Sequence, residues 1–297
     1  MSRWGREVAL VVVSLAMIVA VSPPPEPSEA AAMVIRDPTL VAVGDIARRN
    51  SPSPSQRATA RLAASLDPDA VIVLGDAQYD VGAYSDFLSS YDPTWGRLYS
   101  RTHPVPGNHE YLTAGAAGFF RYFDARIPRN AGYYSFNLGA WHVVALNSYN
   151  GLTPPAAELE WLRADLAADR HRCQLAYWHH PRWSSGAAGV TSPLMEAFWH
   201  VLYRDGVDVV LNGHDHLYER FARRRPSGRL AANGIRQFTV GTGGHGLFTF
   251  GAPAHASRAR IRAFGLLRLV LHETSYRWSF RKITGRVRDS GSTPCHA

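Results

Sequence analysis

The sequence predicts an α/β fold, and three observations support this prediction. Short apolar runs at residues 40–43 and 70–74 flank a helical stretch at residues 56–66. Such alternation indicates buried strands covered by helices. Polar residues that can bind metals follow several of the apolar runs, and the ligand crevice of an α/β sheet lies beyond the carboxyl ends of its strands. Later strands are predicted at residues 174–178, 207–211, 237–240 and 266–271.

Local signals define the other elements. Ser55 is a suitable N-cap for the helix at residues 56–66, and the Asp67-Pro68-Asp69 segment ends that helix because proline cannot continue it. Residues 133–137 and 141–146 are predicted to form a hairpin around the turn at 138–140. Leucines at helical spacing predict a helix over residues 156–168 with one face on a sheet.

The first 32 residues have the pattern of a secretory signal peptide. Arg3 and Arg6 precede an apolar run at residues 8–21, and Ala30-Ala31-Ala32 is a suitable cleavage site. A retained membrane anchor is the alternative, although the run is shorter than the roughly 20 residues that a spanning helix needs. We therefore predict a signal peptide at residues 1–32 and a secreted or otherwise extracytoplasmic protein with no membrane attachment after cleavage. Because no linker divides the rest, residues 33–297 are predicted to form a single domain.

Composition narrows the class of protein further. The chain has 297 residues and 46% hydrophobic content, which excludes a wholly disordered protein. Its net charge of +8 comes almost entirely from arginine, since Lys282 is the only lysine, and we expect no nucleic-acid partner. An arginine cluster fits a solvated loop better than a phosphate-attracting surface. This cluster comprises Arg220, Arg223, Arg224, Arg225 and Arg229.

The two cysteines are Cys173 and Cys295. In an oxidising compartment such a pair can form a disulfide, which would tie the C-terminal tail to the core. The sequence leaves this pairing open.

Five predicted strand ends carry hard oxygen or imidazole donors. Carboxylate, amide oxygen, phenolate and imidazole together suit iron, zinc or manganese, and the absence of cysteine argues against a structural thiolate site. A glycine precedes four of the sites and lets the backbone approach an ion closely. The segments are Val43-Gly44-Asp45, Leu74-Gly75-Asp76-Ala77-Gln78-Tyr79, Pro106-Gly107-Asn108-His109-Glu110, Tyr177-Trp178-His179-His180-Pro181 and Asn212-Gly213-His214-Asp215-His216.

The set GD, GDxxY, GNHE, H and GHxH spans about residues 40–220 and resembles the calcineurin-like metallophosphoesterase superfamily, within it the purple acid phosphatases. Many members have a histidine two residues after the first aspartate, where this chain has Ala47. Tyr79 instead matches the tyrosine with which purple acid phosphatases bind ferric iron. The resemblance implies a four-layer α/β/β/α sandwich of two mixed sheets, with a dinuclear metal site at the strand carboxyl ends.

Carried over to this chain, the resemblance implies two metal ions, a ferric ion with a divalent iron, zinc or manganese ion. Asp76 would bridge them, and two ions about 3.5 to 4 Å apart need such a shared anion. In an extended segment, His214 and His216 point to the same side. One ion would be held by Asp45, Asp76, Tyr79 and His216, and the other by Asp76, Asn108, His179 and His214.

The implied activity is hydrolysis of phosphomonoesters, small-molecule phosphate esters, by attack of a metal-bound hydroxide. His109 would be the general acid, with Glu110 orienting it. His180 is expected to point away from the metals. The sequence does not decide whether His245 lines the substrate side, and aromatic residues near strand ends are more often core than pocket wall. The aromatic residues in question are Trp183, Tyr218 and Phe248.

Two departures weaken the assignment of a substrate. With the predicted cleavage after residue 32, we expect no counterpart of the N-terminal β-sandwich of plant purple acid phosphatases before Asp45, and residues 182–184 occupy the region of their second histidine cluster. Phosphodiesters or nucleotides on the same site are therefore the alternative substrates. A secreted protein that binds metal or phosphate without turnover is the alternative of another class, which the Asn108-His109 pair disfavours. Di-iron oxygen chemistry, a serine nucleophile and a P-loop are disfavoured because their motifs are absent from the sequence.

Overall fold

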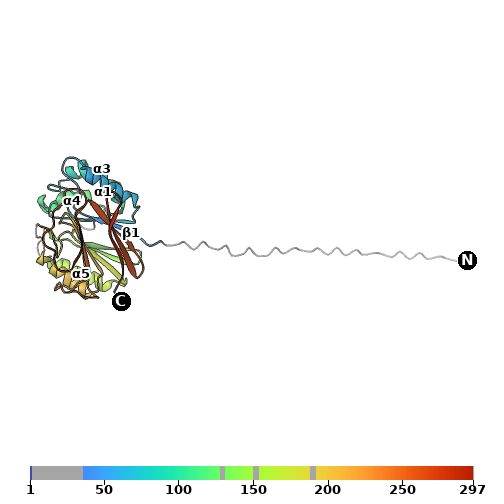
Figure 1. Cartoon of the computed structure of the whole chain (residues 1–297). Coiled ribbons are helices and arrows are strands. Elements are labelled where there is room, and N and C mark those ends of the chain that lie inside the picture. The colour runs from blue at the N-terminus through green and yellow to red at the C-terminus, as the bar shows by residue number, and fades with distance from the viewer. Residues whose placement is uncertain (2–35, 128–130, 150–153, 188–191, 297) are drawn as a thin grey trace. The chain divides into compact units, whose positions relative to one another are not determined.

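Two mixed β-sheets form the centre of the computed structural model, which describes residue 1 and residues 36–127, 131–149, 154–187 and 192–296 (Figure 1). The predicted signal peptide lies outside the described residues, apart from residue 1, so this segment and the domain boundary at residue 33 stay predictions. Residues Asp37–Ala297 form one compact unit. Within the described residues, no helix combines the length and the apolar character needed to cross a bilayer.

The first sheet has six strands in the order β13-β12-β11-β1-β2-β3. Strands β1, β2 and β3 are parallel, and β11, β12 and β13 continue the sheet in antiparallel pairings. The bounds are β1 Thr39–Val43, β2 Ala70–Leu74, β3 Thr102–Val105, β11 Gly265–Leu271, β12 Ser275–Lys282 and β13 Val287–Pro294.

The second sheet has seven strands in the order β10-β8-β9-β7-β6-β5-β4. Its centre, β5, β6, β7 and β9, is parallel, whereas β4, β8 and β10 pair antiparallel at the two sides. The bounds are β4 Tyr134–Leu138, β5 Trp141–Ala145, β6 Cys173–Tyr177, β7 Val209–Asn212, β8 Tyr218–Phe221, β9 Arg236–Val240 and β10 Ser257–Ile261.

The two sheets pack face to face because alternate residues of each strand point to opposite sides. Val143 and Leu175 share a buried cluster with Val41 of the first sheet, whereas their neighbours Val144 and Ala176 belong to a second cluster on the outer face. Aromatic rings also contact each other across the interface, as for Trp141 of β5 and Tyr276 of β12, whose centroids lie 5.7 Å apart. The core is therefore a sandwich.

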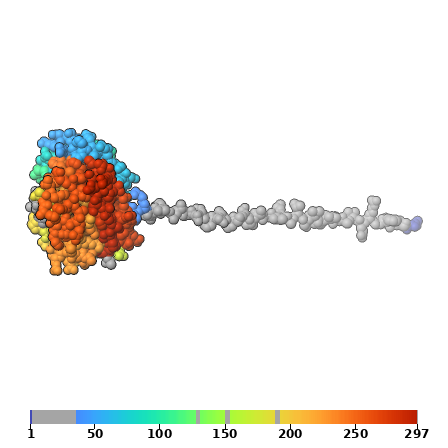
Figure 2. Space-filling view, viewed as in Figure 1, coloured from blue at the N-terminus to red at the C-terminus, as the bar shows by residue number. Residues whose placement is uncertain are grey.

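Helices cover both outer faces, which confirms the predicted α/β sandwich of two mixed sheets. Leu162 of α5 and Phe198 of α6 pack on the second sheet, and α1 packs against β11 of the first. Figure 1 shows α1, α3 and α4 on the side opposite α5, and Figure 2 shows the C-terminal strands, in orange and red, forming much of the face in view. The helices are α1 Pro54–Ser65, α2 Tyr84–Asp86, α3 Asp92–Trp95, α4 Ala117–Tyr122, α5 Ala156–Ala168 and α6 Glu196–Arg204, with short helical turns at 87–91, 96–101, 110–112, 114–116 and 193–195.

The start of α1 corrects one prediction. Ser53, and not Ser55, is the N-cap: its hydroxyl accepts the amide of Gln56 at 3.1 Å, and the Gln56 side chain accepts the amide of Ser53 at 3.3 Å. Pro54 takes the first helical position, where its missing N–H costs nothing. Ser55 lies inside the first turn and donates to the carbonyl of Gly244 at 2.7 Å, so it fastens the helix to the glycine-rich loop near the site.

Cys173 at the start of β6 and Cys295 after β13 form a disulfide, with their Cα atoms 5.5 Å apart. This bond links the two sheets, and it decides the pairing that the sequence left open.

Replacing both cysteines with alanine is expected to lower the free energy of unfolding by about 2 to 5 kcal/mol, because the bond closes a loop of 122 residues in the unfolded chain. Urea denaturation of wild type and Cys173→Ala/Cys295→Ala measures the loss. Wild type treated with a reductant should show a shift of similar size. Equal midpoints for all three samples would contradict a stabilising bond.

Candidate metal centre

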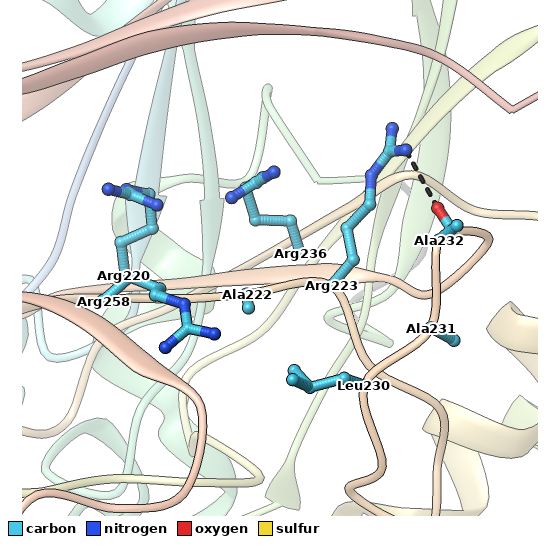
Figure 3. A pocket seen from close by; sticks show the side chains of 8 residues that line it. All are labelled: Arg220, Ala222, Arg223, Leu230, Ala231, Ala232, Arg236 and Arg258. Atoms are coloured by element: carbon cyan, nitrogen blue, oxygen red, sulfur yellow. Dashed lines mark hydrogen bonds between the residues drawn. The ribbon is translucent and has the colours of Figure 1, made fainter.

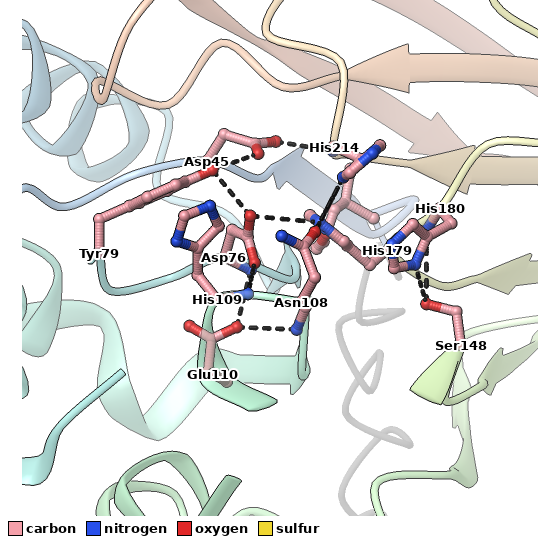
Figure 4. A network of polar contacts seen from close by, with 12 residues as sticks. Asp45, Asp76, Tyr79, Asn108, His109, Glu110, Ser148, His179, His180 and His214 are labelled. Atoms are coloured by element: carbon pink, nitrogen blue, oxygen red, sulfur yellow. Dashed lines mark hydrogen bonds and ion pairs between the residues drawn. The ribbon is translucent and has the colours of Figure 1, made fainter. Parts of the chain in front are cut away.

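Both sheets deliver side chains to one place. Asp45, Asp76 and Asn108 follow the carboxyl ends of the parallel strands β1, β2 and β3, whereas His179 and His214 follow β6 and β7 of the second sheet. Because parallel strands end at the same edge, five separate segments of the chain meet there (Figure 4). His216 and Tyr79 extend two of these segments into the same group.

Three of the donors sit in a backbone conformation that side chains rarely adopt. Asp45 has φ 61°, Asp76 has φ 47° and His214 has φ 69°, all in the left-handed region. Each such backbone conformation costs of order 1 to 3 kcal/mol of folding free energy and persists only where the surrounding structure holds it. Such residues cluster at functional sites. Each turns the chain sharply just after a strand, which aims its side chain back over the sheet edge.

Tyr79 is the centre of one donor group. Its buried hydroxyl oxygen lies 2.8 Å from both Asp45 Oδ1 and Asp76 Oδ2, and 2.9 Å from His216 Nε2. His216 Nε2 in turn lies 3.2 Å from Asp45 Oδ1. One hydroxyl hydrogen cannot serve all these acceptors, whereas a cation shared by a phenolate, two carboxylates and an imidazole satisfies every one.

His179 is the centre of the second donor group. Its Nε2 lies 3.0 Å from Asn108 Oδ1, 3.2 Å from His214 Nδ1 and 3.3 Å from Asp76 Oδ2. Asn108 Oδ1 is also 2.9 Å from His214 Nδ1. The same carboxylate oxygen, Asp76 Oδ2, therefore belongs to both groups.

The tautomer of His179 supports a cation in this second group. Its Nδ1 lies 2.8 Å from the carbonyl oxygen of Leu74, which fixes the ring hydrogen on Nδ1 and leaves the lone pair of the neutral ring on Nε2. Nε2 faces oxygens of Asn108 and Asp76, which are acceptors themselves, so a proton or a metal ion must lie between them. A ring held by a backbone carbonyl while its other nitrogen faces carboxylate and amide oxygens is the usual arrangement of a metal-binding histidine.

The electrostatics of the group favour positive charge between the carboxylates. Burial raises the pKa of Asp76, but the imidazoles of His179 and His109 beside it lower that pKa well below its usual range. Burial lowers the pKa of His179, but the Asp76 and Asp45 carboxylates raise it to about 9, so at neutral pH without a metal ion Nε2 holds a proton that a bound cation would replace. Burial, with His179 adding to it, lowers the pKa of His214 to about 4. The carboxylates are therefore ionised, and His214 is neutral and able to bind metal at neutral pH.

Two glycines allow this close approach. A Cβ on Gly75, which has φ +80°, would lie 2.5 Å from His179 Nδ1, and a Cβ on Gly107 would overlap Asp76 Oδ1. These contacts explain physically why glycine precedes Asp76 and Asn108.

Glu110 braces the loops instead of orienting His109. Its carboxylate accepts the backbone amides of Asp76 at 2.9 Å, Gln78 at 3.0 Å and Gly107 at 2.7 Å. Burial, and then the charge of Asp76, raise the pKa of Glu110 to about 8, against the effect of the Gln78 and Gly107 amides. The side chain thus connects the loops after β2 and β3. The expectation that Glu110 orients the His109 ring has no contact to support it among the described hydrogen bonds.

His109 lies at the mouth of the group, in a cavity of about 480 Å³. Its amide donates to Asp76 Oδ1 at 2.9 Å, and its Nδ1 donates to the carbonyl of Asp80 at 2.5 Å. The first bond holds the backbone, the second orients the ring, and Nε2 has no partner among the described hydrogen bonds. The cavity is lined by Asp76, Tyr79, Asp80, Asn108, His109, His214, His216, His245, Gly246, Leu247 and Phe248.

His180 packs beside the donors. Its Nδ1 lies 2.8 Å from the hydroxyl of Ser148, and its ring centroid is 4.4 Å from that of His214. Burial, and then the charge of His179, lower the pKa of His180 well below its usual value. His180 is therefore a neutral ring that packs against His214. One of its nitrogens lies within 4.8 Å of ligand atoms of His179 and His214, so the expectation that it points away from the metals is not confirmed.

The structure adds two cavity residues that the sequence did not decide. The His245 ring stacks on Tyr79 with centroids 3.7 Å apart, and the Phe248 ring stacks on His216 at 4.1 Å. The guanidinium of Arg48 donates to the carbonyl of His245 at 3.1 Å and holds this loop in place. Only the glycine-rich run before His245 gave a sequence signal, and such runs often form simple turns.

Other aromatic residues are not part of the cavity wall. Tyr218 is buried and donates to Asp289 Oδ2 at 2.7 Å. Trp183 packs against Trp199, with ring centroids 4.5 Å apart, and against the guanidinium of Arg224 at 4.3 Å. The expectation that such residues belong to the core holds for Tyr218.

The arginine cluster does not form one solvated loop. Arg224 is 1% exposed, so this expectation is wrong for it: its stem and guanidinium fill the space beside Trp183 and Phe221. Arg220 instead pairs with Asp289 through Nε at 2.7 Å. No arginine of the cluster lines the cavity of the metal centre. A separate cavity of about 570 Å³ is lined by Arg220, Ala222, Arg223, Leu230, Ala231, Ala232, Arg236 and Arg258 (Figure 3).

Sequence comparison identifies relatives for most of the unit formed by residues Asp37–Ala297. Residues 38–218 match the family model for calcineurin-like phosphoesterases. Purple acid phosphatase 15 of Arabidopsis thaliana is 33% identical over 215 residues, which cover 60% of this chain and 40% of the relative. Purple acid phosphatase 21 of the same plant is 30% identical over 248 residues, covering 73% and 54%. The chain thus spans about half the length of the curated relatives that it matches.

Solved structures share the fold. Purple acid phosphatase from yellow lupin seeds matches with a TM-score of 0.74 at 20% identity, over 86% of this chain and 53% of that chain. GAP50, described as the anchor in the inner membrane complex of Plasmodium, matches with a TM-score of 0.70 at 14% identity, over 88% and 90%. At these identities the likeness concerns the fold alone.

Proposed function

The chain belongs to the calcineurin-like phosphoesterase family, with purple acid phosphatases among its relatives, and from this membership we propose that it hydrolyses phosphate monoesters at a centre of two metal ions. The observation that carries the proposal is the position of Asp76. Its Oδ2 lies 2.8 Å from the Tyr79 hydroxyl of one donor group and 3.3 Å from His179 Nε2 of the other. A single carboxylate shared by two donor sets is what a bridged pair of cations requires.

We assign one ion to the group around Tyr79 and the other to the group around His179. When bound, the two ions neutralise phosphoryl oxygens and lower the pKa of a coordinated water toward neutrality. Tyrosine and carboxylates suit ferric iron, whereas two imidazoles with amide and carboxylate oxygens suit divalent iron, zinc or manganese. The first set is Asp45, Asp76, Tyr79 and His216, and the second is Asp76, Asn108, His179 and His214.

His109 is the proposed general acid. The leaving oxygen of an alkyl phosphate departs as a strong base, so a proton donor next to it speeds the reaction. His109 lines the same cavity as Asp76 and Asn108, and its Nδ1 is occupied by the Asp80 carbonyl at 2.5 Å. Its Nε2 is therefore the nitrogen that gives up the proton. His245 is proposed to orient the substrate from the Tyr79 side of the cavity.

Localisation follows from two features. The disulfide between Cys173 and Cys295 fits an oxidising compartment. The pattern of residues 1–32 fits a cleaved signal peptide. Together they support export of the mature phosphatase. A small-molecule phosphate ester is its proposed substrate, as the family membership implies, and we expect no nucleic-acid or membrane partner.

A non-catalytic binding protein is the competing function, and the fold alone does not exclude it, since the Plasmodium protein described as an anchor shares this fold. Purified full-length chain, loaded with iron and zinc or manganese, is assayed with p-nitrophenyl phosphate and with the bis(p-nitrophenyl) diester. We expect turnover of the monoester to exceed that of the diester. A faster diester would move the proposal to a phosphodiesterase, and no turnover with any metal pair would favour the binding protein.

Tyr79→Phe is expected to remove the visible charge-transfer band of a ferric phenolate, because its ring keeps the packing but lacks the oxygen that reaches Asp45 and Asp76. The absorption spectra of iron-loaded wild type and variant measure this loss. Tyr203→Phe, on α6, is the matched control and should keep the band. A colourless but active wild type would indicate that the first group holds zinc or manganese and not ferric iron.

A further inference from the structure

A second group of metal-binding side chains lies at the other end of the second sheet. His142 is the second residue of β5 and pairs with Asn137 of β4, whereas Asp169 and His171 lie in the turn between α5 and β6. The proposed metal ligand His179 follows the far end of β6, and a strand of five residues is about 17 Å long. The group is therefore separate from the proposed phosphatase centre.

Two imidazole nitrogens and two side-chain oxygens converge there. His142 Nδ1 lies 2.8 Å from Asn137 Oδ1 and 3.7 Å from Asp169 Oδ1, and His171 Nδ1 lies 2.6 Å from the same Asp169 oxygen. The ligand atoms of His142, Asp169 and His171 all lie within 4.8 Å of one another. The side chains of His142 and Asp169 are only 8% and 5% exposed, whereas that of His171 is 29% exposed and gives access from solvent.

A second layer of hydrogen bonds orients these donors. His142 Nε2 donates to Asp165 Oδ2 at 2.8 Å, and Ser135 Oγ donates to the other oxygen of Asp165 at 2.6 Å. Gln174 Nε2 donates to Asp169 Oδ2 at 2.9 Å, which turns Oδ1 toward the two imidazoles. A carboxylate behind a histidine fixes the tautomer that presents a lone pair to a metal.

We propose that Asn137, His142, Asp169 and His171 bind one divalent metal ion, for which zinc is the best match because it favours four nitrogen and oxygen ligands. The site does not depend on the proposed function. Its ion would join the β4–β5 hairpin to the turn that leads into β6. The competing explanation is a doubly protonated His142 held between Asn137 and Asp165, since the same carboxylates also attract a proton.

The test measures zinc in full-length chain whose catalytic centre is disabled by Asp76→Asn/His214→Ala. After dialysis against zinc and removal of excess, this background should keep one zinc per chain by elemental analysis. Adding His171→Ala or Asp169→Asn should lose that equivalent, and adding Asp165→Asn should weaken zinc binding about 10- to 100-fold. The matched control is His200→Ala, whose side chain is 65% exposed on α6, and it should keep the zinc.

Stability gives a second readout. Zinc should raise the melting temperature of the background protein, because an ion that binds only the folded chain stabilises it. Zinc should not raise the melting temperature of the background protein that also carries Asp169→Asn. Asparagine has the same shape as aspartate, so this variant serves as the test if His171→Ala fails to fold. Less than one bound zinc in the background, or equal zinc content with and without Asp169→Asn, would overturn the site and leave the protonated His142 as the explanation.

Discussion

Asp76→Asn is expected to lower kcat/KM for phosphomonoesters by about 10⁴-fold or more, which corresponds to about 5.5 kcal/mol of lost transition-state stabilisation. Asp76 Oδ2 lies 2.8 Å from the Tyr79 hydroxyl and 3.3 Å from His179 Nε2, so the substitution weakens both proposed metal sites at once. Asparagine has the same shape and keeps an oxygen for the His109 amide. The loss therefore reports on charge and metal binding and not on packing.

Metal content separates this explanation from misfolding. Elemental analysis should show at least one ion per chain fewer in Asp76→Asn than in wild type, with the circular dichroism of the wild type retained. Asp124→Asn, which removes an exposed carboxylate after α4, is the control and should keep both metals and activity. Full activity of Asp76→Asn would remove the shared carboxylate from the proposed centre.

His109→Ala is expected to lower kcat by about 10²- to 10⁴-fold for alkyl phosphates, the usual contribution of a positioned general acid. The loss should be much smaller for p-nitrophenyl phosphate, because p-nitrophenolate leaves without a proton. Metal content should not change, since the His109 side chain contacts the Asp80 carbonyl and the Tyr79 ring and belongs to neither donor group. Rates with a series of leaving groups of increasing basicity measure this dependence.

His245→Ala provides the comparison, because His245 lines the same cavity and also contacts the Tyr79 ring. Its loss should raise KM with little dependence on the leaving group. If His109→Ala slows all substrates equally, a positioning role replaces proton donation. If it slows none, His109 takes no part in the reaction.

Local patterns were sufficient to predict part of the secondary structure, but strands β8, β10, β12 and β13 and helix α6 were not among the predicted elements. The apolar run of β2, residues 70–74, and the helix over residues 156–168 have the predicted bounds. Buried strands and amphipathic helices are encoded within a few residues, so such predictions succeed. The prediction of the N-cap of α1 was wrong because Ser53 and Ser55 are both suitable caps. Only the side chain of Gln56, which completes the capping box with Ser53, decides between them.

For the candidate site, the sequence predicted which residues are donors but not the roles of the residues around them. Its seven donors could be named because glycine, aspartate and histidine stand at fixed spacings after apolar runs, and the family resemblance supplied their grouping. The roles of Glu110 and His245 could not be inferred in the same way. Glu110 accepts amides from two loops, which lie 32 and 34 residues away in its farther pairs and three residues away in the nearest. His245 reaches Tyr79 from a segment that no local pattern connects to it.

By itself, the sequence determined the strands and helices that have a clear apolar pattern and the chemistry of the residues at the strand ends, because these depend on neighbours along the chain. The tertiary structure alone decided that Asp76 lies between Tyr79 and His179, that Cys173 pairs with Cys295, and that His142 and His171 meet around Asp169. The physical reason is that these contacts arise from the order and register of strands in two packed sheets. That arrangement is a property of the whole core and not of any segment within it.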